Sequence, residues 1–211
     1  MGICDLHCHL LPAIDDGYVP RESFERMLGL YQESGVNSIA FTPHVYNPYV
    51  TTNIAMIRDT FQWASALASE KGMKTYLGSE LFVGTQEVLK GIAIDRRFFL
   101  VEFGLSLPPG NLLPRLGVLA NSGYTLIIAH IERYVWLTPE DPVIAQFQKL
   151  GCLIQVNVEA VESGKALPYL QAGLVDLIAT DNHGDETLPI RLMEALGNWP
   201  LVYRKMEQMG L

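Results

Sequence analysis

The sequence is poor in cysteine and has no long apolar run. Its three cysteines, Cys4, Cys8 and Cys152, form no paired framework, which is typical of a reducing compartment, so we expect a cytoplasmic protein. No stretch reaches the roughly 18 consecutive apolar residues that a membrane span requires. The first residues show neither the basic nor the apolar region of a signal peptide, so a membrane protein is not expected.

Charged residues are also scarce. They make up 18% of the 211 residues, whereas 49% are hydrophobic, so a full core can form and nothing indicates disorder. The length fits a single domain, and we expect residues 1–211 to form one. The formal net charge of -8 repels phosphate backbones at long range, so we expect no nucleic-acid partner. A local basic pocket can still bind one phosphate group.

Seven short apolar runs alternate with longer segments of helical character. The runs are Ile3–Cys8, Ser38–Thr42, Thr75–Gly78, Phe98–Phe103, Thr125–Ala129, Leu153–Asn157 and Leu174–Thr180. The helical segments are Arg21–Ser34, Ile54–Lys71, Thr85–Ile92, Asn111–Asn121, Asp141–Leu150, Lys165–Gln171 and Pro189–Leu196. The glycines that lie where such a helix would end are Gly35, Gly72, Gly123, Gly151 and Gly173.

This alternation predicts parallel strands joined by crossover helices. An open doubly wound sheet and a closed barrel both fit the pattern. A complete eight-fold barrel typically needs about 250 residues. Seven units in 211 residues therefore favour an α/β fold of the TIM-like barrel type, distorted and seven-stranded, written (β/α)7.

The chain contains only five histidines, and each lies at or just after the end of an expected strand. They are His7, His9, His44, His130 and His183. Glu80 and Glu102 occupy matching places at the third and fourth runs. One histidine of this kind is more often a capping or surface group, but chance does not readily place all five at one end of a sheet. In α/β barrels that end carries the active site.

Pairs of residues two apart strengthen this interpretation. His7 and His9 share one face of a strand, and so would Asp181 and His183, because strand side chains alternate. Imidazole and carboxylate ligands together suit divalent Zn, Fe or Mn. The set is too large for one tetrahedral ion, so we expect two or three metal ions that share a bridging carboxylate.

These motifs occur in the order of a known family. Asp5-Leu6-His7-Cys8-His9, followed by Asp15-Asp16-Gly17, resembles the opening of the polymerase-and-histidinol-phosphatase (PHP) superfamily. More narrowly, the chain resembles the bacterial manganese-dependent tyrosine phosphatases of capsule and exopolysaccharide operons. The other motifs are Thr42-Pro43-His44, Gly78-Ser79-Glu80, Val101-Glu102-Phe103, Ala129-His130-Ile131-Glu132-Arg133-Tyr134, Leu153-Ile154-Gln155-Val156-Asn157 and Thr180-Asp181-Asn182-His183. The resemblance covers essentially the whole chain and implies a distorted seven-stranded barrel with three metals.

The resemblance also implies which residues bind metal. The first ion would be held by His7, His9, Glu80 and Asp181. The second would share Glu80 and add Glu102 and His130. The third would be held by Asp16, His44 and His183. Asp16 is preferred to Asp15 because the family pattern favours the residue directly before the glycine.

The chain departs from these relatives at several positions. Ile131 stands where they have proline, Asn182 where they have alanine, and Val158-Glu159-Ala160 where they have Ala-Gly-Ser. The segment after His44 is less basic than theirs. None of these changes removes an expected ligand. All lie in loops that would line the pocket, so they leave the substrate open.

A metal cluster at strand ends fits phosphoester hydrolysis. Metal binding lowers the pKa of water from about 15.7 to roughly 7, so a metal-bound hydroxide can attack phosphorus at neutral pH. Arg133 is the candidate phosphate clamp, since guanidinium binds two phosphate oxygens at once; the alternative is a surface salt bridge. No residue stands out as a general acid, but a phenol leaves near a pKa of about 10 and needs less protonation than an alkyl alcohol.

We therefore predict a metal-dependent phosphatase that acts on phosphotyrosine proteins. The nearest alternative is a small-molecule phosphatase for a substrate such as histidinol phosphate or a nucleotide. A metal-binding regulatory module without turnover is the alternative from another class, and the acidic charge argues against an exonuclease. A homo-oligomer is left open.

Overall fold

The computed structural model describes residues 2–17 and 19–211, and its strands follow the expected alternation. Each of the seven expected runs contains a strand: β1 (Ile3–Cys8), β2 (Val36–Phe41), β4 (Lys74–Leu77), β6 (Phe98–Glu102), β7 (Thr125–Ile128), β8 (Leu153–Asn157) and β9 (Leu177–Ala179). Within the described residues, every pair of neighbouring strands is parallel. The expected α/β class with parallel strands is confirmed.

Two short strands were not expected. β3 (His44–Val45) and β5 (Glu80–Phe82) follow β2 and β4 after breaks at Thr42-Pro43 and Gly78-Ser79. Pro43 has no N–H to donate to a sheet, so regular pairing stops there. Two hydrogen bonds still join the two segments at these breaks. Gly78 N donates to Phe41 O at 2.9 Å, and Glu80 N donates to Pro43 O at 3.0 Å. The strands then resume with His44 directly opposite Glu80.

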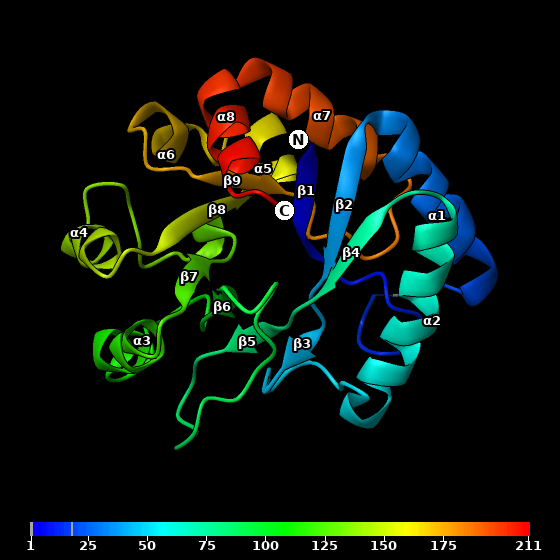
Figure 1. The fold of residues 1–211 in the computed structure, drawn as a ribbon. Helices are drawn as coiled ribbons and strands as arrows, with labels where there is room; N and C mark the ends of the chain where they lie inside the picture. The colour runs from blue at the N-terminus through cyan, green and yellow to red at the C-terminus, as the bar shows by residue number, and fades with distance from the viewer. Residues whose placement is uncertain (1, 18) are drawn as a thin grey trace.

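The strands form two sheets, one with the order β1-β2-β4 and one with the order β3-β5-β6-β7-β8-β9. Figure 1 shows the strands around the middle of the molecule and the helices outside them. Beyond β9, Asn182 forms a parallel bridge with Cys8, and His9 N donates to Asn182 O at 2.8 Å. This link joins the carboxyl ends of β1 and β9, where the motifs His7-Cys8-His9 and Asp181-Asn182-His183 lie.

Six of the seven expected helical segments contain a helix. They are α1 (Arg21–Ser34), α2 (Ile57–Glu70), α3 (Leu112–Asn121), α4 (Pro142–Lys149), α6 (Leu167–Gln171) and α7 (Leu188–Asn198). The five glycines expected at helix ends all have a positive φ, as residues that end helices commonly do. Two further helices, α5 (Val158–Glu162) and α8 (Pro200–Gln208), were not expected. Among the described residues, no helix is both long and apolar enough to cross a membrane.

The expectation of a helix over Thr85–Ile92 is wrong. This segment is an irregular loop that lies against the end of β4 and the start of β5. Ile92 N donates to Ser79 Oγ at 2.9 Å, and a Cβ built on Gly91 would lie 2.8 Å from the same oxygen. The backbone therefore approaches the strand more closely than the width of an α-helix allows.

The core fills the space between the strands and the outer helices. α1 is typical, since Phe24, Met27, Leu28 and Tyr31 recur at helical spacing and are all buried. Against this apolar background, several buried polar side chains stand out at the carboxyl ends of the strands. They are His7, His9, His44, Glu80, Glu102, His130, Gln155, Asn157 and Asn182.

Candidate metal centre

The nine residues expected to bind metal converge beside the carboxyl ends of β1, β2, β4, β6, β7 and β9. They come from β1 and the loop after it (His7, His9, Asp16), from β3, β5 and β6 (His44, Glu80, Glu102), and from the loops after β7 and β9 (His130, Asp181, His183). Contacts of 3.6 Å or less link all nine into one cluster. The chain thus brings together every residue that the motifs singled out as a ligand.

Glu80 lies in the middle of the cluster. Its Oε1 is 2.9 Å from His130 Nε2. Its Oε2 is 3.0 Å from His44 Nδ1, 3.2 Å from His9 Nε2 and 3.3 Å from His7 Nε2. Although the side chain is 1% exposed, Oε2 has no hydrogen bond within the described residues. A buried carboxylate oxygen that faces three ring nitrogens in this way is suited to a cation shared among them.

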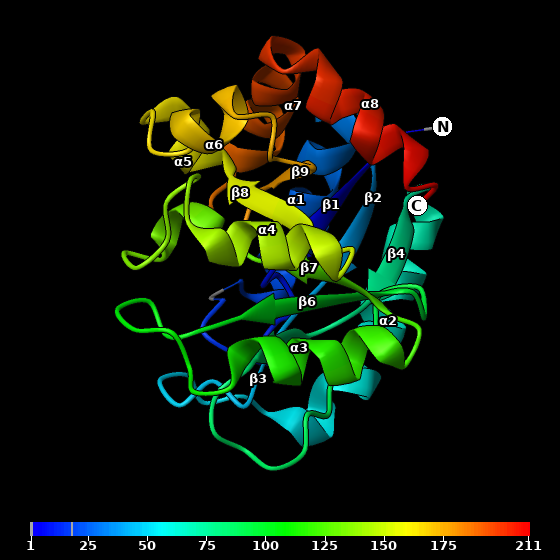
Figure 2. The same ribbon diagram turned by 90° about the vertical axis from the view of Figure 1, so that its left-hand side faces the viewer.

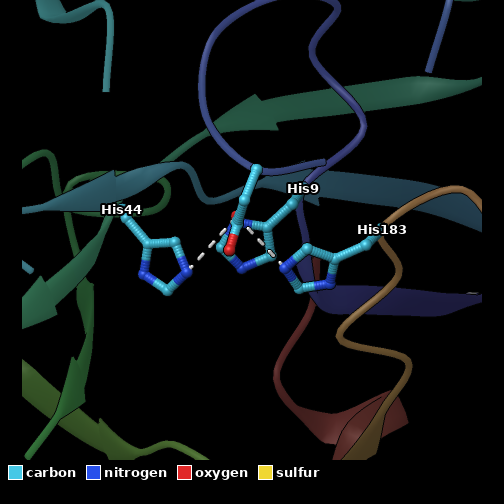
Figure 3. Close-up of side chains that lie close together, drawn as sticks. His9, His44 and His183 are labelled. Atoms are coloured by element: carbon cyan, nitrogen blue, oxygen red, sulfur yellow. Dashed lines mark ion pairs between the residues drawn. The ribbon is translucent and has the colours of Figure 1, made fainter. Parts of the chain in front are cut away.

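A second group surrounds Asp16. Its Oδ1 is 3.3 Å from His183 Nε2 and 3.6 Å from His44 Nε2. The His9 ring lies between the other two rings, with its centre 4.3 Å from that of His183 and 4.4 Å from that of His44 (Figure 3). Ligand atoms of these four residues all lie within 4.8 Å of one another. Asp16 is therefore the acidic residue that faces these imidazoles.

His7 and His9 complete a third group with Asp181. His7 Nε2 is 3.2 Å from both Asp181 Oδ1 and His9 Nε2, and the same Asp181 oxygen is 3.5 Å from His9 Nε2. Two ring nitrogens and a carboxylate oxygen so close together cannot all be joined by hydrogen bonds. The spacing matches the roughly 3 Å between two ligands that each lie about 2.1 Å from one ion.

Glu102 has a different neighbour from the one implied by the family pattern. That pattern groups it with His130, whereas here Glu102 Oε1 is 3.0 Å from His44 Nδ1. Asn47 Nδ2 donates to the same Glu102 oxygen at 2.7 Å. His130 faces Glu80 instead, and its own Nδ1 has no hydrogen bond among the described residues.

The donor set fits divalent metal ions. Four carboxylates, those of Asp16, Glu80, Glu102 and Asp181, face five imidazoles, and no lysine takes part in the contacts described here. Nitrogen and oxygen donors of this kind suit Zn, Fe and Mn. The pairwise distances and the unpartnered Glu80 and His130 atoms support the same conclusion.

Imidazoles and carboxylates shift one another's pKa. Burial lowers the pKa of His44, but the neighbouring Glu102 and Glu80 carboxylates outweigh burial and raise it to about 10. Burial raises the pKa of Asp181, but the charges of His7, His9 and His130 together outweigh burial and lower it to about 2. Ring protons thus balance the carboxylates in the protein without metal. Divalent ions that bind here have to displace those protons.

Asp15 supports the cluster from outside. Its Oδ2 accepts a hydrogen bond from His9 Nδ1 at 2.7 Å and another from the backbone N–H of His44 at 3.0 Å. Its side chain is fully buried. The bond to Nδ1 leaves His9 Nε2 free to face the cluster, as carboxylates commonly do for metal-binding histidines.

Gln155 and Asn157 also hold the site, and they were not among the expected site residues. Gln155 Oε1 lies 3.2 Å from His7 Nδ1 and accepts from the backbone N–H of His130 at 2.8 Å. Gln155 Nε2 donates to Asn157 Oδ1 at 2.6 Å, and Asn157 Nδ2 donates to Asp181 Oδ2 at 2.9 Å. The signal available in the sequence was two polar residues, two apart, at the end of the apolar run that forms β8.

Two residues of the cluster have strained backbones. His130 has φ 31° and Asp181 has φ 52°, a region that side chains with a Cβ seldom adopt. The backbone N–H of Asp181 donates to His7 O at 2.8 Å, which helps to hold it there. Strain of this kind is typical of functional sites, where surrounding contacts enforce it.

Beneath the cluster, a buried polar network joins β1, α1 and the end of β9. Asp5 Oδ2 accepts from Tyr31 Oη at 2.8 Å and from Thr180 Oγ1 at 2.5 Å, and Asp5 Oδ1 accepts from Thr180 N at 3.1 Å. Asp5 and Tyr31 are both fully buried. Since β1 carries His7 and the end of β9 leads into Asp181, this network sets the spacing of the two motifs.

Tyr31→Phe tests the contribution of this network to stability. The variant keeps the packed ring but removes one of the donors to the buried Asp5 carboxylate. We expect the free energy of unfolding to fall by about 1–3 kcal/mol, the usual effect of removing a buried hydrogen bond to a carboxylate. Urea denaturation measures the change, with the exposed Tyr49→Phe as control. Equal stability of the two variants would contradict this role for Tyr31.

Arg133 lies at the rim of the cluster. Its Nη1 donates to Asp181 Oδ2 at 3.2 Å, and its side chain is 47% exposed. Two hollows open on either side of it, with volumes of about 640 and 670 Å³. Both are lined by Arg133, Asp181 and His183. The guanidinium is therefore in contact with the cluster and accessible to a ligand.

Comparisons with known proteins match this chain to one family. The family model described as capsular polysaccharide synthesis, CpsB/CapC, matches residues 3–208. The tyrosine-protein phosphatase CpsB of Streptococcus pneumoniae is 26% identical, over 90% of this chain and 87% of the relative. The tyrosine-protein phosphatase YwqE of Bacillus subtilis is 24% identical, over 91% of this chain and 82% of the relative.

Solved structures support the fold. One comes from the crystal structures of YwqE of Bacillus subtilis and CpsB of Streptococcus pneumoniae, which are metal-dependent tyrosine phosphatases. It matches with a TM-score of 0.79 and 23% identity, over 96% of this chain and 87% of the other. The histidinol phosphate phosphatase of Lactococcus lactis matches with a TM-score of 0.55 and 12% identity, over 93% of each chain. At these identities the likeness shows a shared fold.

Proposed function

Since this chain belongs to the CpsB/CapC family of capsular polysaccharide synthesis, we propose that it is a metal-dependent protein-tyrosine phosphatase. The family resemblance expected from the sequence motifs is confirmed by the family model and by relatives named tyrosine-protein phosphatases. The observation that carries the proposal is the cluster of nine histidine and acidic side chains around the buried Glu80 carboxylate. A site of this composition, beside an accessible arginine, suits phosphate ester hydrolysis.

Two to three divalent ions, Mn, Fe or Zn, are the cofactors of the proposed enzyme. His7, His9, Glu80 and Asp181 would hold the first ion. Glu80, Glu102 and His130 would hold the second, and His44 is near enough to contribute. Asp16, His44 and His183 would hold the third, with His9 beside them. Bound there, the ions would supply positive charge for the phosphate oxygens and a water molecule of lowered pKa as the nucleophile.

The side chains of the protein have separate tasks in this reaction. Arg133 binds two oxygens of the phosphate and stabilises the charge that grows on them during transfer. Asp15 and Gln155 keep the His9 and His7 rings oriented through their Nδ1 atoms. Asn157 holds Asp181 on the side opposite the cluster, so Asp181 stays in place when Arg133 turns toward substrate. A tyrosine leaving group needs little protonation because its pKa is near 10.

Phosphatase activity itself is the first test. The purified protein with Mn²⁺ should hydrolyse p-nitrophenyl phosphate and a phosphotyrosine peptide, and should hydrolyse histidinol phosphate and nucleotides much more slowly. A preference for one of these small molecules would favour the alternative of a small-molecule phosphatase. If the protein hydrolyses no ester with Mn²⁺, Fe²⁺ or Zn²⁺, the proposal is wrong. The remaining interpretation would then be a regulatory metal-binding module without turnover.

We also propose that residues 1–211 form one domain in which both sheets make a single distorted seven-stranded barrel. Support comes from the Cys8–Asn182 bridge between β1 and the end of β9, and from the hydrogen bonds across the break between β2 and β3. Met1 and Tyr18 lie outside the described residues.

Three unpaired buried cysteines are in keeping with the proposed cytoplasmic location. The proposed partner is a phosphotyrosine protein, and we propose no nucleic-acid partner.

Metal removal should destabilise the protein more at high pH than at low pH. In the metal-free protein, the raised pKa of His44, about 10, means that its protonated form stabilises the fold fully below about pH 6.5, the ordinary value for histidine. That contribution is lost as the pH rises from about 6.5 to about 10. In the metal-loaded protein the ions have already displaced the ring proton, so its stability does not fall in this way, and fewer protons compete with the ions as the pH rises.

The measurement is the difference in melting temperature between metal-loaded and chelated protein at pH 6, 7.5 and 9. An ion present at 100 times its Kd stabilises by about 2.7 kcal/mol, so the difference is several degrees at pH 7.5. We expect it to grow steadily with pH. A difference that stays constant or shrinks from pH 6 to pH 9 would contradict the exchange of ring protons for metal.

A further inference from the structure

The two hollows beside Arg133 differ in chemistry. The first, of about 640 Å³, has the metal cluster as its floor and is walled by Tyr49, Val50, Phe82, Leu105 and Leu107. The second, of about 670 Å³, is lined mainly by Glu132, Asn157, Glu159, Ser163 and Lys165, with Val135 and Ala160 among them. Both hollows are lined by Leu105, Arg133, Asp181 and His183. The first hollow is therefore the more apolar of the two, and the second is the more polar and charged.

The apolar side chains that line the first hollow include two that are exposed to solvent and do not belong to the core. Leu107 is 75% exposed and Tyr49 is 87% exposed. They lie in the loops after β6 and β3, which both project from the end of the molecule toward which β6 points (Figure 2). Apolar side chains gathered in this way at the mouth of a site mark a surface that a ligand covers.

We propose that this first hollow, with Leu107 as its central contact, binds the phenyl ring of the substrate and selects aryl over alkyl phosphates. The inference rests on the proposed function. In an aryl phosphate the ring is joined to the ester oxygen, so it must lie directly beside the bound phosphate. With the phosphate between the cluster and Arg133, the ring enters either the apolar or the polar hollow. Burial of its apolar surface favours the apolar one.

The expected effect of the wall is in binding. The ring contacts Leu107 equally in the ground state and in the transition state, so the contact lowers KM more than it raises kcat. In an enclosed pocket one methylene is worth about 10- to 200-fold in kcat/KM. This hollow is open to solvent, so we expect Leu107→Ser to lower kcat/KM for aryl phosphates by about 5- to 10-fold, mainly through KM. Alkyl phosphates lack the ring and should change by less than twofold.

Leu107→Ser is a clean test because the side chain is exposed and does not belong to the core. Kinetics are measured with p-nitrophenyl phosphate and a phosphotyrosine peptide, and with phosphoserine and glycerol phosphate as alkyl esters. Val135→Ser is the matched control: Val135 is equally apolar and 79% exposed, but it lines the polar hollow. Leu107→Met keeps an apolar side chain of similar volume and should retain the aryl preference. Metal content is measured for every variant.

Inhibition gives a second readout that does not depend on turnover. Phenylphosphonate should bind Leu107→Ser several-fold more weakly than the wild type, whereas inorganic phosphate should bind both equally. A selective loss toward the aryl compounds, with Val135→Ser unchanged, supports the ring site. An equal loss for aryl and alkyl compounds, no loss at all, or the same loss in Val135→Ser would overturn it. If the wild type hydrolyses aryl phosphates, the proposed function stands whichever of these outcomes is found. If the wild type hydrolyses no ester, the proposed function itself is wrong.

Discussion

Glu80→Gln is expected to abolish activity, with a fall of about 10³-fold or more, because it disrupts the cluster at its centre. The carboxylate faces four imidazoles, with one oxygen 2.9 Å from His130 and the other within 3.3 Å of His7, His9 and His44. The amide has nearly the same shape, so the packing of β5 is unchanged. It carries no charge, and its NH₂ group repels a cation. A loss of 10³-fold corresponds to roughly 4 kcal/mol of transition-state stabilisation.

Metal content separates this explanation from a purely catalytic one. If Glu80 bridges two ions, elemental analysis of Glu80→Gln should show lower occupancy at two positions, and the melting temperature should approach that of the chelated wild type. Glu87→Gln is the control, since Glu87 is exposed in the loop after the same strand. Full metal occupancy in Glu80→Gln would show that Glu80 does not bridge metals, whatever happens to activity. At most one loosely held ion in the wild type would defeat the cluster itself.

Arg133→Ala is expected to lower hydrolysis of p-nitrophenyl phosphate by about 10²-fold while the metals stay bound. A fall of this size corresponds to roughly 3 kcal/mol, typical of removing one donor that stabilises developing charge. The metals should remain because Asp181 keeps its hydrogen bond from Asn157 when the one from Arg133 is lost. The side chain is 47% exposed, so its removal leaves no cavity in the core.

Charge and geometry at this position can be told apart. Arg133→Lys should recover only part of the activity, since an ammonium group lacks the two-pronged donor geometry. Inhibition by free phosphate should weaken in parallel with activity, because phosphate uses the same clamp. Arg204→Ala removes an exposed arginine of α8 that lines neither hollow beside Arg133, and should change nothing. Unchanged activity and phosphate affinity in Arg133→Ala would show that Arg133 pairs with Asp181 for structural reasons alone.

The sequence indicated most of the strand and helix order because those signals are local. A strand overlaps each of the seven apolar runs, and the glycines at helix ends have the positive φ that a helix end commonly requires. The placement of histidines and acids at strand ends also predicted which side chains meet. In parallel strands that follow one another with the same direction, all carboxyl ends lie on one side, so residues that end strands converge without any knowledge of contacts.

The errors arise where a segment's surroundings override its own pattern. Thr85–Ile92 has residues that suit a helix, but Gly91 and Ile92 lie close against Ser79 and leave no room for one. The short strands β3 and β5 arise from breaks whose continuation depends on hydrogen bonds to the neighbouring strand. α8 begins at Pro200 and packs only two buried side chains, Val202 and Met206, against the core, so its apolar pattern is short.

The sequence by itself determined the class of fold, the end of the sheet that carries the site and the set of side chains that gather there. Only the tertiary structure decided how they pair: that Glu102 lies beside His44, that Asp15 orients His9 while Asp16 faces the imidazoles, and that Gln155 and Asn157 hold the cluster from below. The physical reason is the distance along the chain over which each kind of signal acts. Periodicity and turn residues act over a few positions, whereas these partners are joined across strands by distances and angles that depend on register and twist, which no local pattern encodes.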